Sequence, residues 1–599
     1  MASDYWTKFQ EVRASRRRFL GTGAAAGVGV AGFALVGCGD DAAKPAATST
    51  SAPAGTTTAA GSASASASAA ATQVAGLRGG TLRAPLSGIS SADPPTIYPY
   101  ENLTYLAQTP SSYHYSRLLR GVAKEGVAVE DKTVLEGDIA SKFEVVDPTH
   151  YTFTLKPNIK WQNKAPMNGR AATAQDFVKA YDVFSKVSQN GPKFGAIIDK
   201  VEAPDEKTVK FTLKAPFAPF LSSIAASAEG IWFIPVETID SGQAKEDPVG
   251  TGPFIFRSRA AGVSIKWDRN PDYYDQPYPY FDKVEAGLFN DTQRIVAGLQ
   301  TGDLDLSGLS GAIFKESRSK LDPKGTDWIV QNNVEGGMIF NFDNKPFNDK
   351  RVRQALSMLM DRVGMLKVQD GTTKGTFMAH LPPAQAPYFL DPKDATKFGP
   401  NAKFYAQNVK DAKDLLSAAG AADLSFKMIG NVDRYGAEAK QIWELVTASF
   451  NQAGLKVELI FQEYASYIQS TFLGKMDAGT AAIGPFIGSA NDPDDILFSC
   501  YHTSAPRHNW GGTPIQEQAD IDAMAVKQRT ILDQKERIAY LQDFQRKMAD
   551  IMLTVPYHAS AGYVYQAPWI VNGFLKAGYA YIPDGYMKSW FTKERIAKG

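Results

Sequence analysis

"PVGTGPFIF" (Pro248–Phe256), followed by "DRNPDYYDQPYPYFDKVE" (Asp268–Glu285), is the most distinctive stretch in this sequence of 599 residues. Its first glycines and prolines predict a turn that feeds a strand. Such a turn requires small residues and a positive φ at one position. Gly250 and Gly252 do not make a dinucleotide-binding fingerprint, because Ile255 stands where the third glycine belongs. The stretch therefore indicates a structural turn.

Short strand patterns lie upstream of this turn. Gly80–Leu86 predicts a first strand, and the alternating residues of Tyr151–Leu155 and Val209–Leu213 predict two half-buried strands. Ile159–Trp161 follows a turn and predicts the beginning of another strand. Strands thus dominate the first part of the chain.

Helical patterns alternate with these strands. Thr173 is the expected N-cap of a helix that places Phe177, Tyr181 and Phe184 on one face. A period near 3.6 predicts further helices over Lys350–Met360, Lys410–Ala418, Ala437–Ala453 and Gln534–Met552. Either Asn348 or Asp349 is expected to cap the first of these. Because strands and helices interleave, the predicted fold class is α/β.

Taken in order, these patterns resemble the extracellular solute-binding proteins, family 5, which are the dipeptide- and oligopeptide-binding group of ABC importers. The turn region carries this resemblance together with several other blocks. They are YTFTLKPNIKW (151–161), TAQDFVKAYDVF (173–184), VEAPDEKTVKFTLKAPFAPFLSSIA (201–225), GLQTGDLDL (298–306), FNDKRVRQALSMLMDR (347–362) and NDPDDILFSC (491–500). The resemblance spans most of residues 78–599.

The resemblance implies a periplasmic binding protein-like fold of type II, with two α/β lobes joined by a hinge and an extra inserted domain. The expected boundaries are 78–112, 230–330 and 556–599 for lobe I, 113–229 for the inserted domain, and 331–555 for lobe II. A small solute would bind in the cleft between the lobes, and hinge closure would bury it. The expected function is to deliver that solute, a peptide, an oligosaccharide or a similar molecule, to the permease subunits of an ABC transporter.

The same resemblance implies the position of one ligand contact. In peptide-binding members an aspartate just before the D-P-D block pairs with the α-ammonium of the peptide, and this chain has Ser489 at that position. A serine hydroxyl contributes no charge, and losing one partner of a buried ion pair costs about 2–5 kcal/mol. An ordinary peptide is therefore a poor candidate unless Asp492 or Asp494 supplies the carboxylate.

Aromatic and amide side chains complete the predicted ligand-binding set. Phe486 lies beside the serine, Asn509 and Trp510 belong to a later loop, and Tyr464 follows the strand Val457–Phe461. Aromatic rings with a few polar groups are typical of pockets for small solutes. Ordinary packing is the alternative for each of these residues.

The amino-terminal segment predicts export and a lipid anchor. Ser15–Leu20 resembles a twin-arginine signal, and Leu35–Cys38 resembles a bacterial lipobox. Residues 1–38 are then a signal peptide, Cys38 carries the lipid, and 39–77 is a disordered Ala/Ser/Thr linker. The alternative is an uncleaved short membrane helix. The expected location is outside the cytoplasmic membrane, in the periplasm or at the cell surface.

Composition limits the other classes of function. Lys and Arg number 64 against 63 for Asp and Glu, which argues against a nucleic-acid partner. Cys500 is alone in the folded part, so no internal disulfide is expected. Cys500, His502 and His508 lack the spacing of a four-ligand metal site, and we expect neither a metal nor a cofactor. We expect a monomer.

An enzyme is the remaining alternative. Ser317–Lys320 matches the S-x-x-K pair of penicillin-binding enzymes, but the K-T-G that this chemistry needs is missing downstream. The sequence therefore predicts a binding protein and no enzyme. A solute-sensing receptor on the same scaffold and a lipid-anchored hydrolase are the alternative functions.

Overall fold

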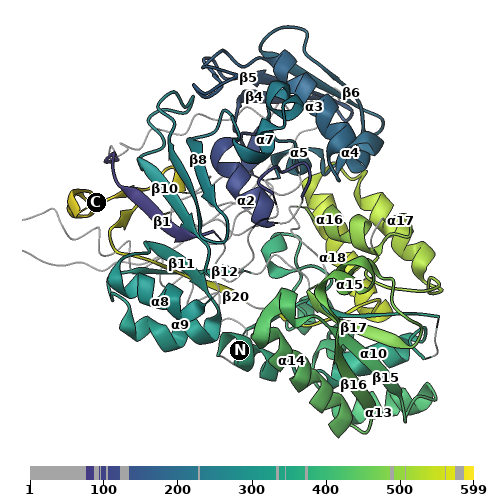
Figure 1. The fold of residues 1–599 in the computed structure, drawn as a ribbon. Coiled ribbons are helices and arrows are strands. Elements are labelled where there is room, and N and C mark those ends of the chain that lie inside the picture. The colour runs from purple at the N-terminus through teal and green to yellow at the C-terminus, as the bar shows by residue number, and fades with distance from the viewer. Residues whose placement is uncertain are drawn as a thin grey trace, which may run out of the picture. The chain divides into compact units, whose positions relative to one another are not determined.

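The computed structural model describes residues 76–86, 94, 96–102, 105–121, 134–226, 230–289, 291–331, 336–343, 346–371, 375–485, 492–505, 508–559, 561–573 and 586–598. The predicted signal peptide with Cys38, and residues 39–75 of the predicted linker, lie outside the described residues. So do Phe486 and Ser489. Gly76–Gly599 form one unit, whose sheets are arranged as in Figure 1.

The turn region feeds the main sheet of lobe I, which has the order β1-β10-β9-β8. Its strands are β1 (Thr81–Pro85), β8 (Phe254–Ala260), β9 (Ser264–Arg269) and β10 (Lys283–Gly287). The requirement for small residues is confirmed, because a Cβ added at Gly250 would lie only 1.9 Å from the carbonyl oxygen of His114. The expected positive φ is wrong: Gly250 and Gly252 are both absent from the residues with positive φ. Glycine is needed here because the backbone of His114 lies so close, and not because the φ angle is positive.

The inserted sheet has the antiparallel order β4-β5-β7-β6. Its strands are β4 (Ala140–Asp147), β5 (His150–Leu155), β6 (Ile198–Glu202) and β7 (Thr208–Leu213). Helix α3 (Ala174–Val187) covers it and begins with the predicted cap, in which Thr173 and Asp176 form a reciprocal capping box. The predicted strand at Ile159–Trp161 is wrong, since only an isolated bridge joins Lys160 to Ala171. Trp161 is instead fully buried in the core.

The chain passes twice between lobe I and lobe II. In lobe I, β20 (Ala561–Gln566) lies between β11 (Leu306–Leu309) and β12 (Thr326–Gln331). Lobe II contains the sheet β16-β15-β17-β13-β18. Its strands are β13 (Gly336–Phe340), β15 (Ser425–Gly430), β16 (Lys456–Phe461), β17 (Thr480–Pro485) and β18 (Val555–Pro556). The connections from β12 to β13 and from β18 to β20 are the two crossings of a two-lobe fold.

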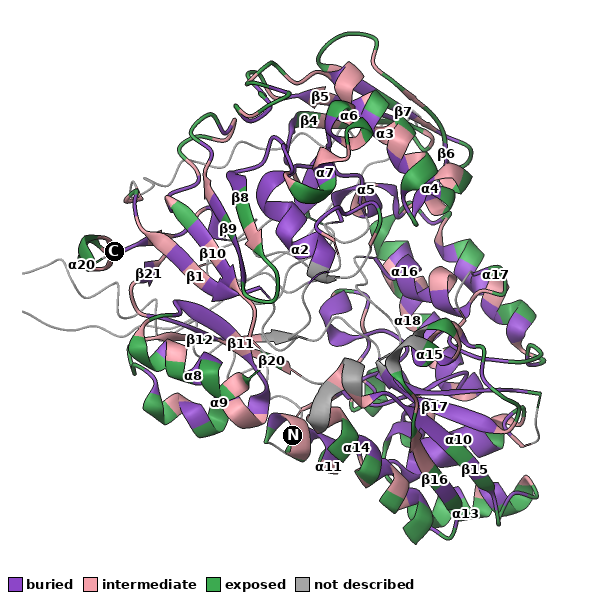
Figure 2. Ribbon diagram, viewed as in Figure 1, coloured by how far each residue is buried: buried purple, intermediate pink, exposed green. Residues whose placement is uncertain are grey.

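Helices cover the lobe II sheet, with buried residues facing it and exposed residues facing outward in Figure 2. The longer helices of lobe II are α10 (Lys350–Leu359), α11 (Arg362–Asp370), α13 (Val409–Ala418), α14 (Val432–Gln452), α17 (Gln518–Gln528) and α18 (Gln534–Ile551). All four helices predicted for this part are confirmed, and Asp349 is the cap of α10. The 3.6-residue pattern thus located the elements that build this lobe.

The remaining described elements are mostly short. In lobe I and the insert they are α2 (Tyr105–His114), β2 (Leu119–Gly121), β3 (Leu135–Gly137), α4 (Gly191–Ile197), α5 (Phe220–Ala225), α6 (Val236–Asp240), α7 (Gln243–Glu246), α8 (Thr292–Thr301), α9 (Gly311–Ser317), β21 (Ile570–Val571), β22 (Trp590–Phe591) and α20 (Lys593–Lys598). In lobe II they are β14 (Thr376–Phe377), α12 (Ala395–Phe398), α15 (Tyr464–Gln469), α16 (Asp494–Ile496), a π-helical turn (Leu497–Tyr501) and β19 (His558–Ala559). Short 3₁₀ turns occur at Arg318–Lys320, Pro383–Gln385, Pro400–Tyr405 and Thr471–Leu473.

Among the described residues, each of these parts contains a hydrophobic cluster, and lobe II has a further small one around Ile339 and Tyr467. One runs from Tyr98 to Val249 in the insert and its neighbours, one from Ile295 to Ala567 in lobe I, and the largest from Met338 to Tyr557 in lobe II. Each part thus has a core of its own. The residue-level domain boundaries given above stay a prediction.

Candidate functional site

The carboxyl ends of three parallel strands mark the candidate binding edge of lobe II. β15, β16 and β17 run parallel and end at Gly430, Phe461 and Pro485. Pro485 pairs with Gly336, the first residue of β13 after the chain crosses from lobe I. Ligands in open α/β sheets bind outside the carboxyl ends of the strands. The candidate site therefore adjoins the crossing.

Part of the predicted ligand-binding set belongs to this edge. Tyr464 begins α15 directly after β16. Phe486 and Ser489 follow β17 in the sequence and lie outside the described residues. These three positions therefore follow the ends of two strands that flank β15 in the sheet.

Asn509 and Trp510 lie at the opposite edge of the same sheet. The amide of Gly511 donates to the carbonyl of Phe340 (2.9 Å). Phe340 pairs with Ala481 near the amino end of β17. At about 3.3 Å per residue, this point is about 13 Å along the strand from Pro485. The structure therefore does not bring Asn509 and Trp510 together with the carboxyl ends.

Trp510 is a core residue of lobe II. It is 2% exposed and stacks on His508, with ring centroids 4.4 Å apart and an interplanar angle of 7°. In the described part of the chain, Trp510 Nε1 and Asn509 Oδ1 have no hydrogen-bond partner. Buried polar groups normally have a hydrogen-bond partner, so we expect a water molecule or another polar group beside each of these two atoms.

Asp492 begins an acidic turn and forms a buried ion pair. Its carboxylate accepts from Arg537 Nη1 (2.9 Å) and also from Nη2, and both side chains are 5% exposed. Burial alone would raise the pKa of Asp492, but the Arg537 guanidinium brings this pKa below its ordinary value. The predicted ligand carboxylate is thus already paired within the protein.

The other two carboxylates of the turn are also paired. Asp494 accepts from Arg529 Nε (2.6 Å) and Nη2 (2.9 Å). Asp495 accepts from Lys193 Nζ (2.7 Å), which belongs to α4 of the insert. Ser222 of α5 donates to Asp492 Oδ2 (3.1 Å). The turn therefore joins the insert to lobe II.

Sequence reasoning missed the partners of this turn, which are Arg537, Arg529, Lys193, Ser222 and also Gln528, whose amide donates to Asp494 Oδ1. Arg537 and Arg529 lie on or before helices 45 and 35 residues downstream of their aspartates. Lys193 and Ser222 lie 302 and 270 residues upstream. The acidic run itself was visible, and three adjacent buried carboxylates require cations, but spacing along the chain does not identify which ones.

A second contact between the lobes lies beside the crossing. Ser310 of lobe I donates to Glu438 Oε1 of α14 (2.6 Å), and Lys315 Nζ of α9 donates to the carbonyl of Asp370 (2.5 Å). Asp370 is 2% exposed, and its Oδ1 has no hydrogen-bond partner among the described residues. Burial raises the pKa of Asp370 to about 7, and Ala561 N–H and Lys315 oppose this only in part.

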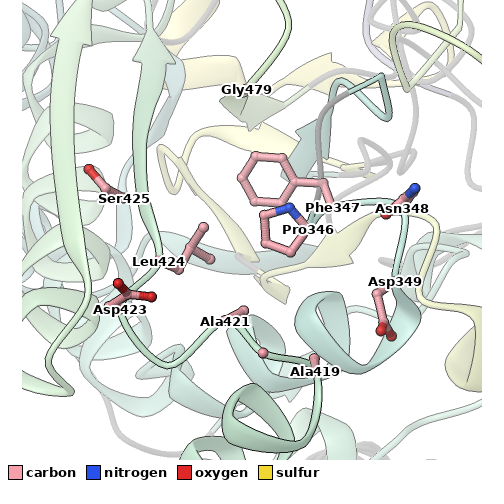
Figure 3. Close-up of a pocket in the computed structure, with 11 residues that line it drawn as sticks. Pro346, Phe347, Asn348, Asp349, Ala419, Ala421, Asp423, Leu424, Ser425 and Gly479 are labelled. Carbon is pink, nitrogen blue, oxygen red and sulfur yellow. The ribbon is translucent and has the colours of Figure 1, made fainter.

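One pocket of the structure lies away from the candidate site. It has a volume of about 490 Å³ and lies between the amino end of α10 and the turn after α13 (Figure 3). Ser425 and Gly479 in its wall stand at the amino ends of β15 and β17, which is the edge remote from the carboxyl ends. A second pocket of about 450 Å³ lies on β8 and β9 of lobe I.

The candidate metal ligands are held by ordinary contacts. Cys500 is buried, His502 Nδ1 contacts Ser504 Oγ (2.9 Å), and His508 Nε2 contacts the carbonyl of Thr503 (2.9 Å). Within the described ranges, no group of three His, Cys, Asp or Glu side chains is arranged to hold a metal ion. No helix in the same ranges has the length and apolar character needed to cross a bilayer.

Comparison with known proteins gives consistent matches. Residues 134–507 match the sequence model of the bacterial extracellular solute-binding proteins, family 5 Middle. Heme-binding protein A of Haemophilus influenzae is 25% identical over 75% of this chain and 83% of that protein. Oligopeptide-binding protein OppA of Bacillus subtilis is 25% identical over 76% and 85%. The periplasmic binding protein DppA of Helicobacter pylori, solved with the peptide STSA, superposes with a TM-score of 0.68 at 20% identity, over 86% of this chain and 99% of that one.

Proposed function

The chain belongs to the bacterial extracellular solute-binding proteins, family 5, and we propose that its lobes close on a small solute for delivery to an ABC permease. The observation that carries this proposal is the double crossing between two lobes that each have their own core. Two such crossings allow a hinge motion while both lobes stay folded. The protein's role is therefore binding a solute, and catalysis plays no part in the proposal.

The proposed binding region is the edge where β15, β16 and β17 end. Tyr464, Phe486 and Ser489 follow these ends and stay the predicted ligand contacts there. Asn509 and Trp510 also stay predictions, but their place at the other edge favours a role in packing. The carboxylate of Asp492 accepts hydrogen bonds from Arg537 and Ser222, so we propose a structural role for Asp492 beside the ligand contacts.

The solute that we propose is not a simple dipeptide or tripeptide. Ser489 supplies no charge for an α-ammonium, and Asp492 and Asp494 are held by Arg537 and Arg529. The two relatives reported above, both 25% identical, are named for different ligands, heme and oligopeptides. A sequence identity of 25% therefore does not show which ligand this chain binds.

Two measurements test this proposal. Native mass spectrometry of the exported protein should find a bound small molecule of defined mass, released on denaturation. Titration calorimetry should give dissociation constants for alanyl dipeptides and tripeptides well above micromolar. Ser489→Asp should tighten their binding, because a buried ion pair is worth about 2–5 kcal/mol. Sub-micromolar binding to the wild type would contradict the peptide argument, and persistent absence of any bound solute would contradict the capture function.

We also propose that an acylated Cys38 holds the protein at the outer side of the cytoplasmic membrane. The twin-arginine pattern and the lipobox-like Leu35–Cys38 support this. Several acyl chains, at about 0.8 kcal/mol for each buried CH₂, hold a soluble domain firmly at a bilayer. Cys38→Ser should release the exported protein or block its processing. A serine variant that stays in the membrane fraction as the wild type does would exclude the anchor.

A further inference from the structure

The contact between the insert and lobe II lies apart from both crossings. Its residues come from α4 and α5 on the insert side, and from the acidic turn, α16 and the turn after α17 on the lobe II side. Figure 1 shows α4 and α5 beside α16 and α17. None of these residues belongs to the connections between β12 and β13 or between β18 and β20. This contact must therefore break when the lobes separate.

Four interactions of different kinds make up this contact. Lys193 Nζ pairs with Asp495 Oδ1 at 2.7 Å, with side chains 18% and 9% exposed. Ser222 Oγ donates to Asp492 Oδ2, and the amide of Ala218 donates to the carbonyl of Arg529 (2.7 Å). The Arg529 guanidinium also lies 5.3 Å from the ring centre of Phe217. Largely desolvated pairs of this kind are stronger than ion pairs at an exposed surface.

Interactions within lobe II hold the acidic turn in position for this contact. Arg537 and Arg529 neutralise Asp492 and Asp494, which keeps three neighbouring carboxylates together in a buried place. The amide of Asp492 also donates to Asp495 Oδ2 (3.2 Å), which orients the carboxylate that Lys193 meets. The acidic turn thus presents fixed carboxylate acceptors, to which the insert supplies two side-chain donors.

We propose that Lys193 and Ser222 act with the turn Asp492–Asp495 as a latch that holds the two lobes closed. The latch rests on the proposed closure of the lobes around a solute. Lys193 and Ser222 are then positioning residues, because they stabilise the closed state without touching the solute. Any solute that binds the closed state is bound more weakly when the latch is lost, since less of the protein is in the competent conformation.

The amide of Ala218 reports this latch directly. Its acceptor, the carbonyl of Arg529, belongs to the other lobe, so exchange with solvent deuterium requires the contact to open. The amide of Leu213 is a matched reporter of folding, because its acceptor is Thr149 of the same insert (2.8 Å). Hydrogen exchange of the full-length protein, resolved to single amides by mass spectrometry, measures both without a ligand.

A charge-exchange series tests the latch. Lys193→Asp and Asp495→Lys each place like charges together and should speed exchange at Ala218 by about tenfold or more, while Leu213 stays protected. The double variant should restore slow exchange. Lys186→Asp, which disrupts an exposed pair with Asp182 on α3, is the control and should change neither amide.

Two results would overturn the latch. One is unchanged Ala218 exchange in both single variants with Leu213 protected. The other is fast exchange in the single variants that the double variant does not slow. Ser222→Ala gives a milder test, in which exchange at Ala218 should rise while the ion pair of Asp492 with Arg537 stays intact. A protein that bound no solute could still show the predicted pattern, so this series judges the latch separately from the proposed function.

Discussion

Replacing Asp370 by asparagine should change how the stability of the protein depends on pH. Asp370 lies beside the crossing, 2% exposed, and the pKa of its carboxyl is raised from 3.8 to about 7 by burial. The folded state therefore holds this proton more tightly than the unfolded state does. Stability from this group is fully present below about pH 4 and is lost as the pH rises to about 7.

The size of the effect follows from the shift. Three pKa units at about 1.4 kcal/mol each correspond to about 4 kcal/mol of stability lost between the two ends of this window. Asparagine has nearly the same shape and no charge at any pH. Relative to the wild type, Asp370→Asn should therefore gain up to about 4 kcal/mol at pH 8 compared with pH 4.

Urea unfolding followed by tryptophan fluorescence measures this difference, at pH 4 and pH 8 for both proteins. Subtraction is needed because burial lowers the pKa values of His380 and His558 to about 3, and these groups act in the opposite direction. The exposed Asp414, which pairs with Lys410, provides a control whose replacement by asparagine should matter by less than about 0.5 kcal/mol. The reasoning would be refuted if the change in unfolding free energy from pH 4 to pH 8 were the same in Asp370→Asn and in the wild type, or if the two differed with the opposite sign.

Three further predictions concern stability. Asp492→Ala leaves Arg537 buried without its partner and should cost about 3–5 kcal/mol in urea unfolding, and adding Arg537→Leu should recover part of this. Thr173→Ala removes the cap of α3 and should cost about 1 kcal/mol by the same measurement, whereas a cost near zero would mean that the capping box contributes nothing. Gly250→Ala forces a Cβ against the carbonyl of His114 and should lower the melting temperature by several degrees, about 2–4 °C per kcal/mol, and an unchanged melting temperature would show that the backbone yields there.

Local signals predicted the elements that local interactions determine. Thr173 and Asp349 mark helix starts by hydrogen bonds that span only a few residues, so the sequence alone reveals them. The ordered blocks predicted the family and its two-lobe fold. The strand at Ile159–Trp161 failed because the amide of Trp161 bonds to the carbonyl of Arg170 across a turn, which no alternation of residue types announces.

The site was harder to predict because its geometry depends on the order of strands. Trp510 and Ser489 are near neighbours in the sequence, yet β13 lies next to β17 and holds Gly511 at the amino end of that strand. Likewise, the partners of Asp492 and Asp495 come from elements up to 302 residues away. Tertiary contacts of this kind are invisible to spacing along the chain, and only the acidic residues themselves could be noted.

The position of β20 has a consequence for biosynthesis. This strand lies between β11 and β12, and its residues Ala561–Gln566 are made after all of lobe II. Ribosomes add about 5–20 residues each second, so the gap between β11 and β12 waits tens of seconds for its central strand. Lobe I is consequently completed only after lobe II has been made.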